Sequence, residues 1–532
     1  MKKLLYILLF AAHGLCAQNA VWQWSIPVTP VISTETGAAP QAFLWIPENC
    51  RQVRGVVIGQ HNMSEEGILE HAYFRKKMAE AGLAEIWVTP GFAMVYNHEK
   101  DSAVFDYMLK EFANVSGYKE LEYAPIVPIG HSAYASYPWN FAAFNNSRTL
   151  AIISVHGDSP QTNLTGSGKP NPDWEQRDID GIPALFIMGE YEWWEDRIAP
   201  GFNYVKKHPG SAITFFADAG HGHFDSSDIL VKYIADYIVK AAKWRLTGKN
   251  DNDGRPLLKK ILPQQGWLGD RWHKDSLPKA IPAKYKDYKG NRDAASWFFD
   301  KNHAEETEKY YAVAAGKLPQ YIGFTQQGKV LKPVKTHANY KLDFKPLGDG
   351  VSFAVSAFFS DSTKVQAVEK HAKTKLVTDR ICGPIKKINN TLFRIDFYRM
   401  GFKNPKRSND IWLLAHNEGD ENYKSAVQQL NLQFPVRNVQ GEAQQISFPE
   451  IHDVQDTHKP LSLTATASSG LPVYYYVNEG PAYVEDNILL FSKVPPKAKY
   501  PIKVTVVAWQ YGVAGKWQSA TPVQQTFTLQ NR

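Results

Sequence analysis

Cysteine is scarce in this chain of 532 residues, which contains only three. Apart from Cys16 near the N-terminus, the two others, Cys50 and Cys382, lie far apart in the sequence. Two cysteines are too few for a disulfide framework or a metal cluster. No apolar run beyond the first 17 residues is long enough to span a bilayer. The sequence therefore excludes a disulfide-stapled scaffold and predicts no membrane span.

The chain also lacks a strong excess of one charge. It contains 60 Lys and Arg against 53 Asp and Glu, with a formal net charge of +7 and no basic run. Nucleic acid is therefore not an expected partner. The composition, 44% hydrophobic and 21% charged, is that of a globular protein with room for two to four domains.

The N-terminus has the pattern of a secretory signal peptide. Lys2 and Lys3 precede the apolar run 4–12, and a short stretch of mostly small and apolar residues ends at Ala17. This apolar run is too short for a transmembrane helix, so we expect cleavage after Ala17 and a secreted or periplasmic protein.

From residue 54 to 245 short apolar strands alternate with amphipathic helices, which predicts an α/β fold with a largely parallel sheet. The expected strands are 56–58, 86–88, 124–129, 150–155, 184–188 and 213–216, and the expected helices are 65–82, 101–113 and 227–245. We expect a catalytic domain over 18–248. Residues 249–331 read as a connector that wraps on it, with a helix over 293–315.

After residue 332 the apolar period changes to two, which predicts all-β structure. We expect one β-sandwich domain over 332–440 and a second over 441–532. The second contains the stretches SSGLPVYYYV (468–477) and GPAYV (480–484), and it resembles the immunoglobulin-like (Ig-like) repeats of secreted bacterial proteins.

A serine lies at the centre of the stretch YAPIVPIGHSAYASYPWNFAAF (123–144), which reads as a buried strand, a sharp turn and a helix. The G-x-S turn with Ser132 at its apex resembles the nucleophile elbow of the α/β-hydrolases. Tyr134 replaces the glycine that usually ends that motif. The resemblance implies an α/β-hydrolase sheet with helices on both faces and Ser132 as nucleophile.

A serine nucleophile needs a base and an acid that orients the base. Both follow in the family's order, serine, acid, histidine. The segment AGHGHF (219–224) follows the last expected strand. Its small-Gly-His turn matches the family pattern at His221, with His223 as the alternative base.

The acid is expected after the strand 184–188, where the family has G-x-x-D. This sequence has Gly189-Glu190-Tyr191-Glu192, so the resemblance points to Glu192. The alternatives that remain are Glu190, Glu195, Asp196 and, after the preceding strand, Asp158.

An oxyanion intermediate needs two backbone donors. By resemblance these are the amide of Ala133 and that of Asn62 or Met63. His61 in the same loop and the aromatic residues Trp193 and Trp194 are candidates for contact with substrate. No metal and no cofactor are expected.

We therefore expect a secreted serine esterase that works through an acyl-enzyme. A secreted protein with β modules and an aromatic-rich catalytic face resembles the carbohydrate esterases that remove acetyl or methyl esters from plant cell-wall polysaccharide. The alternatives are a peptidase or lipase-like hydrolase of the same fold, or a glycan-binding or scaffold protein with an inactive hydrolase core.

Overall fold

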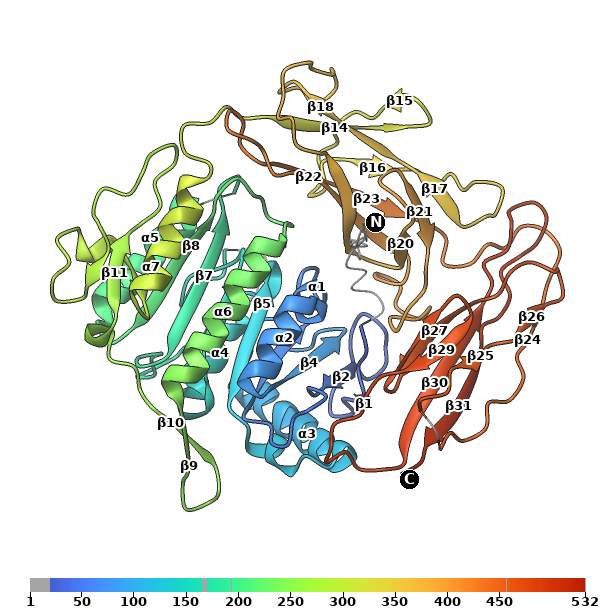
Figure 1. Ribbon diagram of the computed structural model, residues 1–532, viewed down its shortest axis with the longest axis horizontal. Coiled ribbons are helices and arrows are strands. Elements are labelled where there is room, and N and C mark those ends of the chain that lie inside the picture. The colour runs from blue at the N-terminus through green and yellow to red at the C-terminus, as the bar shows by residue number, and fades with distance from the viewer. Residues whose placement is uncertain (1–19, 165–169, 193, 456, 532) are drawn as a thin grey trace, which may run out of the picture.

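An eight-stranded mixed sheet forms the core of the N-terminal half (Figure 1). The computed structural model describes residues 20–164, 170–192, 194–455 and 457–531, so the expected signal peptide lies outside it. The strand order is β1-β2-β4-β3-β5-β6-β7-β8, with β3 to β8 parallel and β1 and β2 antiparallel at one edge. The strands are β1 (Trp24–Pro27), β2 (Gln41–Trp45), β3 (Gly55–Gln60), β4 (Leu83–Thr89), β5 (Ile126–His131), β6 (Ile152–Val155), β7 (Pro183–Gly189) and β8 (Ala212–Asp218).

Helices cover both faces of this sheet. Within β3, Val57 packs with the helices that follow it, α1 and α2, whereas Val56 and Ile58 pack with α3 on the other face, as the alternation of side chains in a strand requires. The prediction of an α/β sheet with helices on both faces is confirmed. The helices are α1 (Glu65–Glu70), α2 (Ala72–Ala81), α3 (His98–Ser116), α4 (Tyr137–Phe144), α5 (Trp194–Lys207) and α6 (Asp228–Arg245).

In the α/β part, two helices differ from the expected ones. The single helix expected over 65–82 breaks at His71, whose backbone is extended (ψ 129°) and whose Nδ1 accepts the amide of Tyr73 to start α2. The helix expected to start at Asp101 starts at His98, because the Asn97 side chain caps it and Asp101 accepts the Asn97 amide at 2.7 Å.

The segment after α6 lies along the edge strand β8. It contains β9 (Leu246–Asn250), β10 (Pro256–Leu258), β11 (Trp267–Asp270), β12 (Ala283–Lys284), β13 (Ala295–Phe298) and α7 (Lys301–Ala312). Ser296 donates to the carbonyl of Phe215 at 3.0 Å and so joins β13 to β8. The helix expected over 293–315 therefore begins only after this strand.

The C-terminal part consists of small, mostly antiparallel sheets, as the period of two predicts. Their strands are β14 (Tyr321–Gln326), β15 (Lys329–Val330), β16 (Lys341–Leu342), β17 (Ser352–Ala354), β18 (Ser356–Ser360), β19 (Val377–Cys382), β20 (Ile385–Lys387), β21 (Leu392–Ile395), β22 (Asp410–Asn417), β23 (Ala426–Gln433), β24 (Ile446–Ser447), β25 (Leu461–Ser462), β26 (Thr466–Ala467), β27 (Tyr474–Glu479), β28 (Ala482–Glu485), β29 (Ile488–Phe491), β30 (Ile502–Trp509) and β31 (Val523–Leu529). The Ig-like character of the last region stays a prediction.

Cys50 and Cys382 are both buried and unpaired. Across the described ranges, no helix is both long and apolar enough to cross a membrane.

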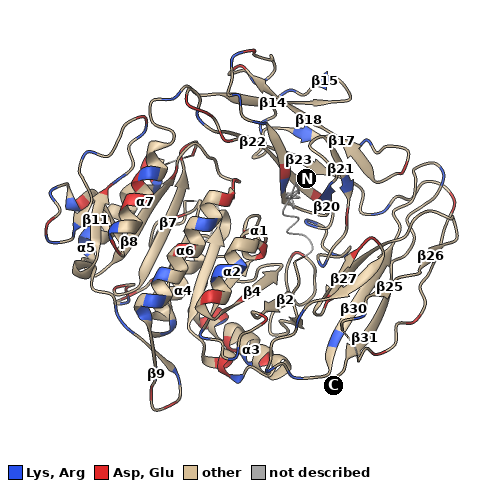
Figure 2. Cartoon of the chain, viewed as in Figure 1, with Lys and Arg blue, Asp and Glu red and all other residues tan. Residues whose placement is uncertain are grey.

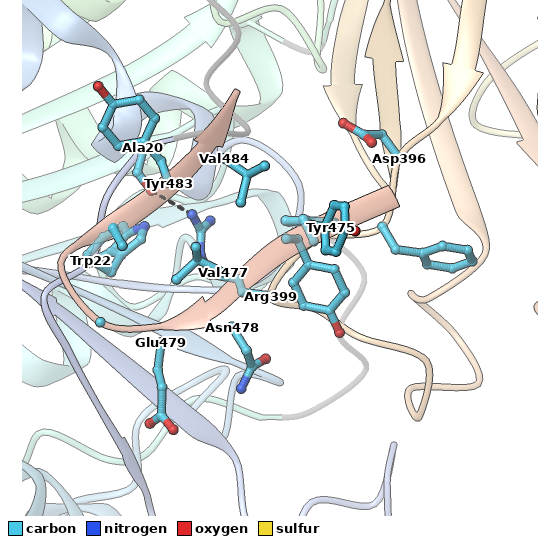
Figure 3. Close-up of a pocket in the computed structure, with 15 residues that line it drawn as sticks. Ala20, Trp22, Asp396, Arg399, Tyr475, Val477, Asn478, Glu479, Tyr483 and Val484 are labelled. Atoms are coloured by element: carbon cyan, nitrogen blue, oxygen red, sulfur yellow. Dashed lines mark hydrogen bonds between the residues drawn. The ribbon is translucent and has the colours of Figure 1, made fainter. Parts of the chain in front are cut away.

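Buried charges join the β part to the α/β part at helix α1. Arg399 donates from Nη1 to Glu66 at 3.0 Å and to Glu70 at 2.6 Å, and Arg380 pairs with Glu66 at 3.2 Å. All four side chains are at most 11% exposed. Arg399 also donates from Nη2 to the carbonyl of Ala20 at 2.6 Å, beside a cavity of about 40 Å³, which has room for only a few waters (Figure 3).

We predict that Arg399→Met lowers the free energy of unfolding by about 3–5 kcal/mol, because it leaves the buried Glu70 without its paired cation and Glu66 with Arg380 alone. Denaturant unfolding followed by tryptophan fluorescence measures this loss. The matched control is Lys301→Met, which breaks an exposed pair with Glu305 and is expected to have no measurable effect. Equal losses in the two variants would contradict the prediction.

Candidate active site

Ser132 lies at a sharp turn between β5 and α4. Its φ is +53°, in the left-handed region that non-glycine residues rarely adopt, and it opens a short 3-10 turn over Ser132–Tyr134. A Cβ on Gly130 would lie 2.1 Å from the carbonyl oxygen of Tyr134, so only glycine allows the turn. The Tyr134 ring is buried against Gly91 in the loop after β4. The expected elbow geometry at Ser132 is therefore present, with the tyrosine packed on the loop after β4.

Three side chains from three strand ends form a chain of hydrogen bonds. The Ser132 hydroxyl donates to Nε2 of His223 at 2.7 Å. Nδ1 of His223 donates to Oε1 of Glu192, also at 2.7 Å. Ser132 follows β5, Glu192 follows β7 and His223 follows β8, so all three lie at the carboxyl ends of parallel strands, where catalytic groups gather in open α/β sheets.

His221 does not contact Ser132, and this corrects its choice as the base. Nδ1 of His221 instead pairs with the carboxylate of Asp225, four residues further on. Asp218, His221 and Asp225 are buried, with donor atoms within 4.8 Å of one another. Burial lowers the pKa of His221, but the two carboxylates outweigh it and raise the pKa to about 10. A charged His221 inside this cluster cannot serve as a base at neutral pH.

The Glu192 carboxylate is buried, and both of its oxygens accept hydrogen bonds. Its Oε2 accepts Nδ1 of His156 at 3.1 Å and the amide of Gly189 at 2.9 Å, while Oε1 accepts His223. Burial would raise its pKa, but His156 and His223 outweigh that effect and lower the pKa below the ordinary value. Glu192 therefore stays ionised and can balance a positive charge on His223.

The other candidate acids do not take part in the hydrogen-bonded chain of Ser132, His223 and Glu192. Asp158 is fully buried and binds Ser136 at 3.0 Å and Arg197 at 2.6 Å. Glu190 binds Lys424 of the β part at 2.7 Å and accepts the Gly220 amide at 2.8 Å. Glu195 pairs with Arg271, and Asp196 lies in the first turn of α5.

The expected oxyanion donors are only partly available. Ala133 follows the nucleophile in the 3-10 turn. The amides of Asn62 and Met63 instead donate to Oε2 of Glu65 at 3.2 and 3.1 Å, and Oε1 of Glu65 accepts the His131 amide at 2.7 Å. Burial raises the pKa of Glu65 to about 7. Glu65 thus ties the loop after β3 to the end of β5, and the expectation that Asn62 or Met63 is a free donor was wrong.

The expected substrate contacts are also corrected. His61 is 5% exposed, and its Nδ1 lies 2.9 Å from the hydroxyl of Thr89, so it holds the loop. Trp194 is buried at the start of α5 and packs edge-on against Trp272 at 5.6 Å. Trp193 lies outside the described residues.

The β part supplies residues beside the site that sequence reasoning missed. Arg407 donates to the carbonyl of Asn62 at 2.9 Å, and Tyr191 donates to the carbonyl of Ser425 at 2.8 Å. Trp412 packs on Phe224, next to the His223 ring. These residues come from positions more than 180 beyond the catalytic loops, so no local motif could have indicated them. His156 was missed although it follows an expected strand.

The sheet and the elbow define an α/β-hydrolase-like N-terminal region. No protein-family model matches the sequence, and no curated protein matches it. Structural similarity covers 42% of the chain for each of three solved structures. They are the S-formylglutathione hydrolase FrmB from Staphylococcus aureus (14% identity, 97% of its chain, TM-score 0.29), a hyperthermophilic esterase from the archaeon Pyrobaculum calidifontis (17%, 88%, 0.31) and a truncated carbohydrate esterase from gut microbiota (13%, 98%, 0.30). At these TM-scores the similarity itself establishes no function.

We predict that Glu65→Gln changes the pH dependence of stability. The Glu65 pKa is about 7 in the folded chain against an ordinary value of 4.5, so folding favours the protonated form. The contribution of Glu65 to the free energy of unfolding is therefore complete below pH 4.5 and is lost as the pH rises to about 7. Relative to the variant, the wild type should lose stability on the order of 3 kcal/mol across this window and none above it.

Unfolding in denaturant at several pH values checks this window. Glu305→Gln, at an exposed helix position, is the control and should follow the wild type at every pH. A constant difference between wild type and Glu65→Gln from pH 4.5 to 8 would contradict the assignment.

Proposed function

We propose that the protein is a serine hydrolase that cleaves carboxylic esters through an acyl-enzyme, with Ser132 as nucleophile, His223 as base and Glu192 as the orienting acid. One observation carries this proposal: the continuous hydrogen-bonded chain from the strained Ser132 through His223 to the buried Glu192. An inactive scaffold has no need to keep this geometry or its backbone strain.

Each group has a defined task in the reaction. Ser132 attacks the ester carbonyl while its proton moves to Nε2 of His223, and the cation that forms is balanced by Glu192. The amide of Ala133 is the proposed donor to the oxyanion. His223 then protonates the leaving alcohol and afterwards takes a proton from the water that cleaves the acyl-enzyme. The proposal needs no cofactor.

We further propose that the substrate is an acetyl or methyl ester on plant cell-wall polysaccharide and that the protein acts after export. The N-terminal sequence pattern supports export. The aromatic side chains near the catalytic loops, Tyr191 at 43% exposure and the partly buried Trp412, support a sugar substrate because their rings can stack on sugar faces. A long apolar lid, expected of a lipase, is absent from the sequence.

We predict that Ser132→Ala and His223→Ala each lower kcat on a nitrophenyl acetate by at least about 10³-fold, because each removes a member of the catalytic unit. His221→Ala is the matched control: it changes the neighbouring histidine but not the hydrogen bond to Ser132. A loss in His221→Ala as deep as that in His223→Ala, with both variants folded by circular dichroism, would overturn the assignment of the base.

Release of acetate or methanol from acetylated and methyl-esterified polysaccharides tests the substrate class. The expected result is release that Ser132→Ala abolishes. Cleavage of small esters with no release from any such polysaccharide would leave the hydrolase assignment standing and refute the polysaccharide substrate.

His156 offers a further test of the site. Burial lowers its pKa, but the Glu192 and Asp218 carboxylates outweigh burial and raise it. A charged His156 competes with His223 for Glu192. We predict that His156→Gln, which keeps a donor but no charge, moves the acidic limb of the kcat/KM profile to higher pH. His416→Gln, which removes a histidine bound to Asp379, is the control; an unmoved limb in His156→Gln would refute the role.

A further inference from the structure

A large groove lies at the end of the sheet opposite Ser132. Its volume is about 1290 Å³, and its walls come from α3, from the segments that precede β5, β6 and β7, and from the hairpin β9–β10. These segments meet the amino ends of the parallel strands, whereas the catalytic side chains follow the carboxyl ends. The groove is therefore separate from the site already described.

Arg245, the last residue of α6, lines this groove and is 1% exposed. Its Nε and Nη1 atoms are buried and have no hydrogen-bond partner, and no carboxylate pairs with it among the described residues. Burial lowers the pKa of Arg245 only to about 10, so the guanidinium stays charged at neutral pH. An uncompensated buried cation is unfavourable, which makes this position one where an anion would be stabilising.

Other side chains that line the groove combine positive charge with aromatic rings. Arg177 lies over the ring of Phe144 at 4.8 Å, and Arg255 lies over the ring of Tyr123 at 5.7 Å. Tyr123 is 41% exposed, so its ring is open to a ligand. Rings beside cations are suited to flat, partly apolar sugar rings that carry acidic groups.

Carboxylates also line the groove and narrow the choice of ligand: Asp106, Glu122, Asp178 and Asp251. Asp106 pairs with Arg148 of the same groove at 2.9 Å, and charges of both signs are mixed along α3 (Figure 2). A polyphosphate chain would be repelled by these carboxylates. Carboxylates accept hydrogen bonds from sugar hydroxyls, and the groove is much larger than a single ion requires. A sugar chain with a sparse negative charge matches both properties.

We propose that this groove is a second, non-catalytic binding site for an acidic oligosaccharide, in which Arg245 binds a sugar carboxylate. The site is independent of the proposed esterase activity. It would hold a uronic-acid-containing chain on the face of the domain that lies away from Ser132.

Calorimetry with a trimer of galacturonic acid tests the proposal, with the neutral galactose trimer, inorganic sulfate and inorganic phosphate as comparison ligands. We expect the acidic trimer to bind and the neutral trimer to bind at least tenfold more weakly. Binding of sulfate or phosphate as tight as that of the acidic trimer would show an anion site without sugar recognition and would overturn the proposal.

Arg245→Met tests the residue, because methionine fills similar space without charge. We expect at least a tenfold loss of affinity for the acidic trimer, unchanged cleavage of a nitrophenyl acetate, and a melting temperature without ligand that is unchanged or higher. Arg292→Met, at an arginine that lies over the Tyr285 ring outside the groove, is the control and should bind as the wild type does.

If Arg245→Met does not fold, the double variant Arg255→Gln/Lys260→Gln provides a second test of the same groove. Both residues are exposed in the groove, and their loss should weaken the acidic trimer at least tenfold. Wild-type affinity in the double variant, or in a folded Arg245→Met, would refute the site.

Discussion

Three buried glutamates on the short helix α1 connect the two halves of the molecule. Glu65 faces the sheet and accepts amides from the loop after β3 and from the end of β5. Glu66 and Glu70 accept hydrogen bonds from Arg399 of the β part. Because buried carboxylates are stable only with such partners, the position of α1 fixes the catalytic loop and the β part together.

The nucleophile and its acid could be predicted because local sequence decides their geometry. An apolar strand, a glycine and a serine specify the turn at Ser132, and the strand 184–188 places Glu192 at the same edge of the sheet. Strands and amphipathic helices of the α/β part were likewise found from periodicity. The switch to a period of two also predicted the all-β structure that follows, although the arrangement in two sandwich domains stays a prediction.

The base could not be chosen from sequence, because His221 and His223 differ by the path of one turn. Gly220 has a φ of +82°, and the counter-charges of Asp218 and Asp225 hold His221 away from Ser132. Distant residues hold this turn, because Glu190 accepts the Gly220 amide at 2.8 Å and Ser425 donates to the Gly220 carbonyl at 2.9 Å. The break at His71 likewise depends on a distant residue, because His71 bonds to Asp228 on another helix. The residues of the β part that border the site could not be predicted either, because they lie far from the catalytic loops in the sequence.

The first described residues contact the last β region: Trp22 bridges to Gly480, and Ser25 donates to Glu479 at 2.8 Å. Such contacts link positions more than 450 residues apart. During synthesis β1 can pair with β2 early, but its contacts with Glu479 and Gly480 form only after almost the whole chain has been made. The contact of Asn62 with Arg407 also forms late. Completion of the catalytic face, unlike formation of the sheet, therefore depends on the last part of the chain, and a nascent chain released early would lack the residues of the β part that border the site.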